Sequence, residues 1–248
     1  MNGAPHCLQV DWPAPAHVRA AFSSRRGGVS EGAYASLNLG NHVGDRPAAV
    51  TANRAALARH LGLREEPCWL QQVHSDILLD LDDAASPRRG DAAITTTVGR
   101  VATVMVADCL PVLLCDASGR QVAAVHAGWR GLACELIART VAAFDAPPSA
   151  LHAWLGPAIG AAAYAVGDDL RTRFVALDAR NAAGFAQHDG RWHMSLARIA
   201  ELQLTALGVG SVSHSGICVH CDAQQWVSYR RDGESGRMAA MIWIEGRA

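Results

Sequence analysis

Residues 101–131, VATVMVADCLPVLLCDASGRQVAAVHAGWRG, are the stretch of the sequence that decides the fold. Short polar breaks separate apolar, valine-rich runs, and their length and composition favour buried β-strands over helices. The expected strands are Val101–Ala107, Pro111–Cys115 and Gln121–Val125. The last six residues, His126–Gly131, carry two glycines and lead into an apolar helical pattern at Leu132–Phe144. The stretch therefore predicts three consecutive strands followed by a helix.

The same criteria place helices and strands on both sides of this stretch. Apolar residues recur at helical spacing in Pro47–Leu61, where proline suits the first turn and a glycine follows the end. Acidic residues begin a second helical pattern, Asp168–Leu177, and a glycine stops a third, Ser195–Leu207. Further strands are expected at Val18–Phe22, Ile77–Leu81, Ala153–Leu155 and Met238–Ile244. Because strands and helices alternate without a regular βαβ order, we predict an α/β or α+β fold of mixed β-sheets covered by helices.

Composition limits the classes of protein to which the chain can belong. Its 248 residues are 50% hydrophobic, and no linker or repeat divides them, so we expect one domain over residues 1–248. The formal net charge of -1 lacks the basic excess of proteins that bind nucleic acid. The apolar runs are too short to span a membrane, and Met1–Val10 lacks a signal-peptide pattern, so we expect a cytoplasmic protein. Seven cysteines without an export signal favour reduced thiols over disulfides.

A cysteine and a histidine within the deciding stretch are the first candidate metal ligands. If Asp116–Gly119 is a four-residue hairpin loop, Cys115 faces Arg120, and antiparallel counting then puts Cys109 directly opposite His126. Opposed residues of an antiparallel pair have Cβ atoms about 5 Å apart, near enough to bind one ion. The proline two residues after Cys109 cannot donate to the strand ladder, so a bulge there would shift the pairing by one residue.

His74 is the best candidate for a third ligand, because it begins a strand-like run among polar neighbours. Thiolate and imidazole ligands suit zinc, and three protein ligands leave one position open, as in catalytic zinc sites. Taken singly, a buried cysteine is more often a packing residue, and a lone histidine is more often structural. A competing ligand set is the segment Cys218-Val219-His220-Cys221 with His214 nearby, which lacks a second ligand pair. A third interpretation is a non-catalytic protein in which the metal only stabilises the fold.

Three glycine-containing loops that carry arginine are candidate anion sites. Arg130 lies at the junction of a strand end and a helix N-terminus, where free N–H groups and the helix dipole favour an anion. Arg25 and Arg230 belong to loops of similar composition, and an arginine can bind phosphate through two hydrogen bonds. The alternative for each loop is that its glycines only make a turn and its arginines are solvated. Together the three loops favour an anionic substrate or cosubstrate.

Several segments, in order along the chain, resemble the YfiH-like family, known as purine nucleoside phosphorylases, multicopper polyphenol oxidases and peptidoglycan editing factors. They cover nearly the whole chain and are Phe22–Ser30, Ser36–Asp45, Gln72–His74, Ala107–Pro111, His126–Gly131, Gly156–Gly160, Ser228–Asp232 and Gly236–Arg237. The resemblance implies the family's layered sandwich of mixed sheets between helices. It also implies that the family's zinc, with copper as a possible replacement, is bound by His74, Cys109 and His126.

The resemblance further implies a zinc-dependent enzyme that cleaves adenosine, inosine and methylthioadenosine with phosphate. Adenosine deamination and copper-dependent oxidation of phenols are further activities of the family. Arg25 corresponds to the arginine of a family motif and is an expected phosphate contact. Asn38 and Gln72, from the matching segments, join Arg130 and Arg230 as expected substrate- or phosphate-binding residues. The expected partners are a nucleoside and phosphate, without nucleic acid or membrane.

The expected proton carrier of such an enzyme is Asp108, which adjoins Cys109, or His42. Either could serve a deamination, in which activated water attacks C6 of a purine, or assist the departing base in phosphorolysis. The chain departs from the family at Ala165, where a glutamate is common, and at Ser195, where an aspartate is common. These departures bear on the positioning of substrate and not on the metal.

A different use of the same zinc is a hydrolase that edits peptidoglycan precursors. In that enzyme the arginine loops would bind a nucleotide-sugar diphosphate. The copper oxidase is the least favoured reading, because multicopper oxidases need several more histidines close together, and the other histidines are scattered along the chain.

Overall fold

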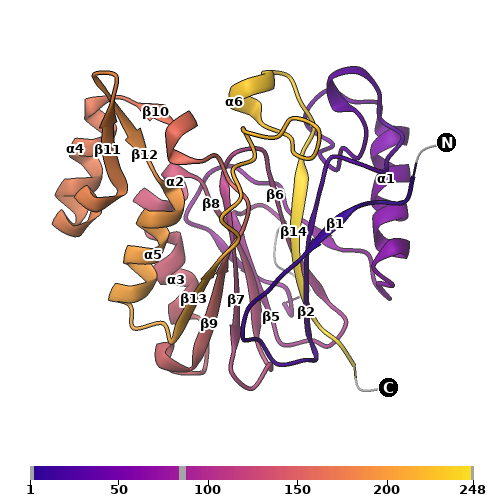
Figure 1. Ribbon diagram of the computed structural model, residues 1–248. Helices are drawn as coiled ribbons and strands as arrows, with labels where there is room; N and C mark the ends of the chain where they lie inside the picture. Colours follow the sequence, from indigo (N-terminus) through magenta and orange to yellow (C-terminus); the bar gives the residue numbers. More distant parts are fainter. Residues whose placement is uncertain (1–2, 84–87, 247–248) are drawn as a thin grey trace.

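Two β-sheets packed face to face form the centre of the molecule, and helices cover both outer faces (Figure 1). The computed structural model describes residues 3–83 and 88–246, so the predicted domain's first two and last two residues and 84–87 lie outside the described ranges. The predicted α+β arrangement of mixed sheets and helices is confirmed.

The first sheet has five strands, in the order β1 (Cys7–Gln9), β2 (Val18–Ser23), β14 (Met238–Ile244), β6 (Val101–Val106) and β3 (Cys68–Trp69). Its neighbouring strands are antiparallel except β3 and β6. Helix α1 (Pro47–His60) packs on the outer face, where Leu57 joins a buried cluster with Leu37 and Trp243. As predicted, Pro47 stands in the first turn of α1, and Gly62, with a left-handed φ of 65°, follows its end.

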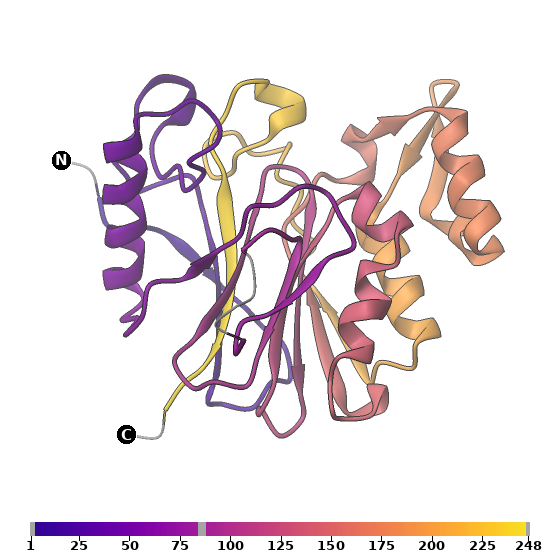
Figure 2. The same ribbon diagram turned by 180° about the vertical axis from the view of Figure 1, so that it is seen from behind.

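The second sheet has six strands, in the order β13 (Ser211–His214), β9 (Leu151–Leu155), β7 (Leu110–Asp116), β8 (Val122–Ala127), β5 (Ala92–Thr95) and β4 (Leu78–Asp80). The β13–β9 and β4–β5 pairs are parallel, and the others are antiparallel. The outer face is covered by α2 (Trp129–Ala133), α3 (Leu136–Ala142) and α5 (Leu196–Ala206). Figure 2 shows these layers from behind, with α1 on one side of the sheets and α3 and α5 on the other.

Both faces of β7 are buried, which explains why its sequence is continuously apolar from Leu110 to Cys115. Successive side chains of a strand point to opposite faces, so Leu113 and Cys115 lie between the two sheets, whereas Leu114 packs against the helices. The same alternation in β8 turns His126 toward the space between the sheets. Cys109, just before β7, packs at that space too. The fold therefore brings both predicted ligands to one end of the space between the sheets.

A smaller antiparallel sheet of three strands lies beside the sandwich, next to α5 (Figure 1). Its strands are β10 (Ala165–Val166), β12 (Arg191–Met194) and β11 (Phe185–His188), and it packs with α4 (Asp168–Leu177). Helix α6 (Tyr229–Asp232) stands before β14. Short 3-10 helices occur at Gly32–Tyr34, Pro148–Ala150, Ala161–Ala163 and Ala179–Gly184. No helix among the described residues has the length and apolar composition needed to cross a membrane.

The single helix predicted at Leu132–Phe144 is wrong, because two helices, α2 and α3, share this segment. Glu135, between them, has a left-handed φ of 59°, which the interior of a right-handed helix does not allow. The predictions for α1 and α4 hold to within one residue. Ser195, predicted as the start of the third helix, is the N-cap of α5, and its Oγ accepts a hydrogen bond from the Arg198 amide at 3.1 Å.

The register predicted for the β7–β8 hairpin is wrong by two residues. Cys115 pairs with Val122 instead of Arg120, and His126 pairs with Pro111. The reason is Asp116, which extends β7 by one residue while its carboxylate accepts hydrogen bonds from the Arg120 and Gln121 amides, both at 2.7 Å. A shift of two residues keeps every side chain on its predicted face, so Cys109 and His126 remain neighbours on a diagonal.

Candidate metal centre

His74, Cys109 and His126 converge at the open end of the space between the two sheets. One ligand atom from each residue lies within 4.8 Å of the others, so the three could hold one metal ion. His126 is buried on β8, Cys109 is half-buried in the turn between β6 and β7, and His74 is exposed in the loop before β4. The rings of His74 and His126 meet edge to face, with centroids 4.9 Å apart. The candidate site is therefore buried at His126 and exposed to solvent at His74.

Two unusual backbone features bring Cys109 into this position. Asp108 adopts a positive φ of 87°, which turns the chain sharply between β6 and β7. Gly128 lies against the thiol, and a Cβ atom at that position would stand 2.7 Å from the Cys109 sulfur. A side chain at residue 128 would displace the sulfur, so the glycine is required by close packing at the metal site.

Asp91 joins two of the candidate ligands. It stands directly before β5, beside His126 on β8, and its carboxylate lies 2.9 Å from His126 Nδ1. The same carboxylate accepts hydrogen bonds from the backbone amides of Val73, His74 and Ser75, at 3.2, 3.0 and 2.6 Å. These bonds hold His74 at its left-handed φ of 59°. With Nδ1 bonded to Asp91, the Nε2 atom of His126 is left for a metal, a common arrangement of histidine ligands.

The charges of these groups support metal binding. Burial opposes ionisation of Asp91, but hydrogen bonds from His126 and Ser75 outweigh it and hold the pKa of the carboxyl well below its usual range. Burial also opposes ionisation of Cys109, yet the charge of His126 and hydrogen bonds from both histidines lower the pKa of the thiol to about 6. The thiolate is the form of cysteine that binds metals, so Cys109 is prepared as a ligand.

A pocket of about 530 Å³ opens over the three candidate ligands. Three arginine guanidinium groups line it, and each lies over an aromatic ring: Arg130 over Trp129 at 4.4 Å, Arg230 over Tyr164 at 5.0 Å and Arg237 over Tyr229 at 5.9 Å. Such pairing holds a guanidinium in place and leaves its edge free to donate hydrogen bonds. Arg230 and Arg237 each use one nitrogen, Nη1, to bond backbone carbonyl oxygens. Asp108 is the one carboxylate among the described residues of this lining. The pocket is therefore suited to an anion next to flat, apolar surfaces.

The two predicted proton carriers, Asp108 and His42, both line this pocket. Asp108 has both carboxylate oxygens engaged, since Oδ1 accepts from the Ser228 hydroxyl and Oδ2 from the Arg230 amide, each at 2.6 Å. It thereby fixes the start of α6 and with it Arg230. His42 stands at the rim, and partial burial together with the charges of Arg237 and Arg54 lowers the pKa of its imidazole. His42 is therefore neutral at neutral pH and free to accept a proton.

The predicted substrate-binding residues divide into two groups. Arg130, Arg230 and Gln72 line the pocket, and the Gln72 carboxamide also bonds the backbone of Met105, at 2.7 and 2.8 Å, which ties its loop to β6. The structure does not bring Arg25 or Asn38 to the pocket.

Arg25 and Asn38 instead hold loops in place. Arg25 donates to the carbonyl oxygens of Ala35 and Ala223, at 3.0 and 2.8 Å. Asn38 is buried, and its Oδ1 accepts from the Arg237 amide at 2.9 Å. Asn38 therefore positions a pocket residue without reaching the pocket itself.

Sequence reasoning missed several residues of the site. Asp91 gave a weak signal, as a lone acidic residue between a glycine and an apolar strand. Arg237 stood in a matching segment, but nothing in the sequence placed it near Cys109. The pocket aromatics Trp129, Tyr164 and Tyr229 carry no local pattern that separates them from core residues.

At the two positions where the chain departs from the family pattern, Ser195 and Ala165, other groups make the local contacts. Ser195 caps α5 through its hydroxyl, as an aspartate would. Ala165, in β10, offers only its backbone oxygen, which accepts a hydrogen bond from Arg230 Nη1 at 3.1 Å. The missing carboxylate thus leaves Arg230 held by the backbone of β10.

The competing ligand set, Cys218, His220 and Cys221 with His214, is not brought together as a group of three possible ligands. His214 is the last residue of β13, and its Nε2 atom lies 3.4 Å from Oε1 of Glu201 in α5. Within residues 3–83 and 88–246, only the group of His74, Cys109 and His126 has the arrangement of a three-ligand metal site.

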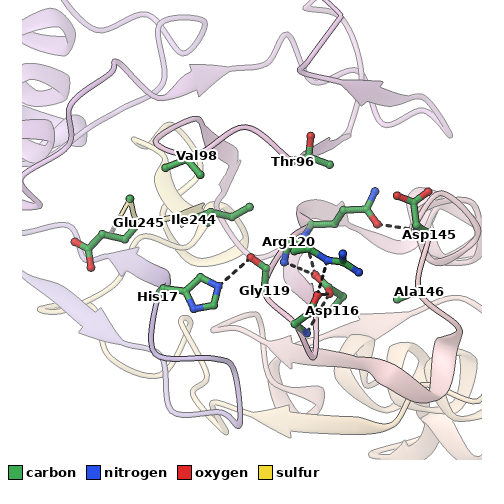
Figure 3. Close-up of a pocket in the computed structure, with 13 residues that line it drawn as sticks. His17, Thr96, Val98, Asp116, Gly119, Arg120, Asp145, Ala146, Ile244 and Glu245 are labelled. Atoms are coloured by element: carbon green, nitrogen blue, oxygen red, sulfur yellow. Dashed lines mark hydrogen bonds between the residues drawn. The ribbon is translucent and has the colours of Figure 1, made fainter. Parts of the chain in front are cut away.

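A larger cavity, of about 620 Å³, lies at the opposite end of the β7–β8 hairpin (Figure 3). Its polar groups serve the hairpin turn: the His17 ring bonds the Gly119 carbonyl oxygen at 3.2 Å, and Asp116 binds the amides of the turn. None of its residues belongs to the possible metal-ligand group. The candidate metal group therefore lies at the other end of the hairpin.

Comparison with known proteins gives consistent matches along the chain. Residues 19–245 match the family model described as multi-copper polyphenol oxidoreductase laccase. A Pseudomonas aeruginosa protein named purine nucleoside phosphorylase is 44% identical over 240 residues, which cover 96% of this chain and 98% of that protein. Escherichia coli purine nucleoside phosphorylase YfiH is 43% identical over 234 residues, with 94% and 96% covered.

Solved structures agree with these matches. A Neisseria meningitidis protein superposes with a TM-score of 0.91 at 43% identity, over 97% of this chain and 99% of that one. Bacillus licheniformis YfiH has a TM-score of 0.86 at 28% identity, with 92% and 93% covered. The chain therefore belongs to the YfiH family, whose model carries the description of a multi-copper polyphenol oxidoreductase laccase and whose curated relatives are named purine nucleoside phosphorylases.

Proposed function

We propose that this protein is a cytoplasmic, zinc-dependent purine nucleoside phosphorylase that acts on adenosine, inosine and methylthioadenosine. The observation that carries the proposal is the pocket that combines three candidate metal ligands with three arginines, each held over an aromatic ring. Phosphorolysis needs one site for phosphate beside one for a flat base, and this lining offers both. The names of the relatives support the same reaction.

The residues fit a metal of the zinc type. Two imidazole nitrogens and one thiolate form a donor set that zinc prefers, and three protein ligands leave one tetrahedral position open. A zinc ion held by His74, Cys109 and His126 would supply Lewis acidity beside the substrate. Copper accepts the same donors, so metal analysis of the purified protein decides between them.

The reaction can be written with the residues of this chain. Arg130, Arg230 and Arg237 hold phosphate, one oxygen of which attacks C1′ of the ribose. The bond from C1′ to the purine breaks, and its electron pair goes to the departing base. Neutral His42, at the rim, passes the proton: one ring nitrogen accepts the proton that phosphate loses, while the other donates its own proton to the base, which leaves as neutral adenine. Asp108 acts indirectly by fixing Arg230.

The decisive experiment incubates the zinc-loaded protein with adenosine, with and without phosphate, and separates the products by chromatography. We expect adenine and ribose 1-phosphate in equal amounts, and only with phosphate present. Absence of base release from metal-replete protein would rule out the phosphorylase. Inosine formed without phosphate would point to the second candidate, an adenosine deaminase, which the open metal position and the neutral His42 also favour.

The pH profile of this activity tests the role of His42. Arg237→Gln removes a positive charge that lowers the pKa of His42, so this pKa should rise toward its ordinary value of 6.5. If neutral His42 is required, the acidic limb of kcat/KM moves to higher pH in the variant. Arg120→Gln, at the far end of the hairpin, is the matched control and should leave the limb in place. A limb that stays or moves to lower pH in Arg237→Gln contradicts this role.

The remaining alternatives are separated by other substrates. A hydrolase that edits peptidoglycan precursors would turn over muropeptides faster than adenosine. A copper oxidase would oxidise phenols after copper loading, although a three-ligand group supplies fewer histidines than a multicopper cluster needs. A non-catalytic metal protein would show none of these activities and would unfold when its metal is removed.

A further inference from the structure

Cys218 and Cys221 form a close thiol pair outside the metal centre. They belong to the loop between β13 and α6, two elements labelled in Figure 1. The two residues begin and end a tight turn, in which the Cys221 amide donates to the Cys218 carbonyl oxygen at 3.2 Å. Their sulfur atoms lie 2.7 Å apart. A disulfide bond is about 2.05 Å long, and the ends of a β-turn lie within the Cα separation that disulfides span. Oxidation of the pair therefore needs only a small movement.

The surroundings of the pair favour thiol chemistry. The Cys218 sulfur accepts hydrogen bonds from the Cys221 thiol and from the Gly160 amide, the latter at 3.3 Å. Burial opposes ionisation, but these bonds and the amides of the turn lower the pKa of Cys218. Cys221 is exposed, so a soluble molecule can reach its sulfur. The pair thus combines a stabilised thiolate with an accessible thiol.

The other cysteines lack this combination. All seven are described; apart from Cys109 at the metal centre, the remaining four have a raised pKa, mainly because of burial. Burial raises the pKa of Cys115 to about 12 and that of Cys7 to about 11. The pKa of Cys221 is raised as well, but mainly because its thiol donates to Cys218. What singles out the turn is geometry: among the seven described cysteines it holds the one exposed thiol and the one pair of sulfurs within hydrogen-bond distance.

The turn also contacts the wall of the metal pocket. The Ala158 amide donates to the Ile217 carbonyl oxygen at 3.2 Å, and the Val219 amide donates to that of Ala158 at 3.0 Å. Ile159, the next residue, lines the pocket, and its amide bonds the carbonyl oxygen of Asp108 at 2.9 Å. A movement of Cys218 is therefore passed by direct backbone bonds to a residue of the pocket.

We propose that Cys218 and Cys221 are a thiol–disulfide exchange site, which a low-molecular-weight disulfide such as glutathione disulfide oxidises reversibly and whose state is felt at Ile159. The proton of Cys221 moves along the sulfur–sulfur hydrogen bond to Cys218, and the Cys221 thiolate attacks one sulfur of the disulfide. The first thiolate leaves and takes the proton from Cys218. The Cys218 thiolate then displaces the second thiolate and closes the protein disulfide. Two protein sulfurs are oxidised, and one disulfide is reduced to a thiol and a thiolate.

The test uses the zinc-loaded protein in mixtures of reduced and oxidised glutathione, in which zinc shields Cys109. The protein is then denatured with a chelator present, so that every remaining free thiol including Cys109 is alkylated, and mass spectrometry of peptides counts and locates the oxidised cysteines. We expect two of the seven thiols to be lost, a disulfide-linked Cys218–Cys221 peptide, and full recovery with excess reduced glutathione. Seven free thiols at high glutathione disulfide, a stable glutathione adduct only, or a disulfide elsewhere would overturn the proposal.

Variants separate the roles of the two sulfurs. Cys218→Ser should stop at a glutathione adduct on Cys221, because the resolving thiol is missing. Cys134→Ser, which removes a half-buried thiol with a raised pKa, should oxidise like the unaltered protein. A Cys218→Ser protein that shows no adduct under these conditions would contradict attack by Cys221.

The transmission to the pocket has its own readout, which does not depend on any substrate. The methyl resonance of Ile159, assigned by comparison with Ile159→Val, should shift when the pair is oxidised. It should not shift in the Cys218→Ser/Cys221→Ser protein under the same conditions. An unchanged resonance in protein whose pair is fully oxidised would refute the contact with the pocket wall.

Discussion

Cys109→Ala should leave a folded protein that no longer retains zinc and no longer cleaves adenosine. Even the loss of a hydrogen-bonding partner of a metal ligand lowers metal affinity roughly 10- to 100-fold, so removal of the thiolate itself should weaken zinc binding by at least about a hundredfold. Cys109 lies half-buried in a turn, so its truncation should change the free energy of unfolding by no more than about 1 kcal/mol. Metal content, phosphorolysis and thermal denaturation measure the three effects.

The matched control for this variant is Cys115→Ala. Cys115 is fully buried between the two sheets, and burial raises the pKa of its thiol to about 12. Its truncation should lower the free energy of unfolding by about 1 kcal/mol while zinc content and activity stay unchanged. If Cys109→Ala keeps its zinc, the ligand set is wrong. If the variant is unfolded at temperatures where the zinc-loaded unaltered protein is folded, the metal supports the fold and the catalytic role is contradicted.

The fold could be predicted to a large extent because its central strands are buried on both faces. Met238–Ile244 is apolar throughout and Val101–Val106 is apolar except for Thr103, and every predicted strand is found with its ends moved by at most two residues. The missed strands are short or at the edges, as β1 and β3 are, or contain small residues, as β5 does. Glu135 shows the limit of pattern reasoning, since no apolar period marks a left-handed residue between two helices.

Cys109 and His126 lie close together, as predicted, although the strand register used to predict this was wrong. The hairpin register was wrong by two residues, yet Cys109 and His126 still share a face because the side chains of a strand alternate with period two. An error of one residue would have separated them. The alternation of side chains along a strand cannot predict contacts between residues that are distant in the sequence. Arg237 is held at the pocket by its contact with Asn38, which links residues 199 positions apart. Pairings of that kind depend on the whole fold.

Asp91→Ala should have the largest combined effect on stability and metal binding. The change leaves His126 Nδ1 and the amides of Val73, His74 and Ser75 without their shared acceptor. Removing one partner of a buried ion pair lowers stability by about 3–5 kcal/mol, and loss of a ligand's hydrogen-bonding partner weakens metal binding roughly 10- to 100-fold. Thermal denaturation of the metal-free protein and competition with a chromophoric chelator separate these effects.

Asp91→Asn refines the test, because it keeps the shape of the side chain and removes only the charge. It should lose less stability than Asp91→Ala, and both variants should bind zinc more weakly if the carboxylate orients His126. Asp82→Ala is the matched control: its carboxylate also has a pKa far below its usual range, owing to hydrogen bonds from Thr95 and Thr96 that outweigh burial, but it does not contact a candidate ligand. That variant should lose stability alone. Equal zinc affinities of Asp91→Ala and the unaltered protein would show that His126 is oriented by the packing of β8 and not by Asp91.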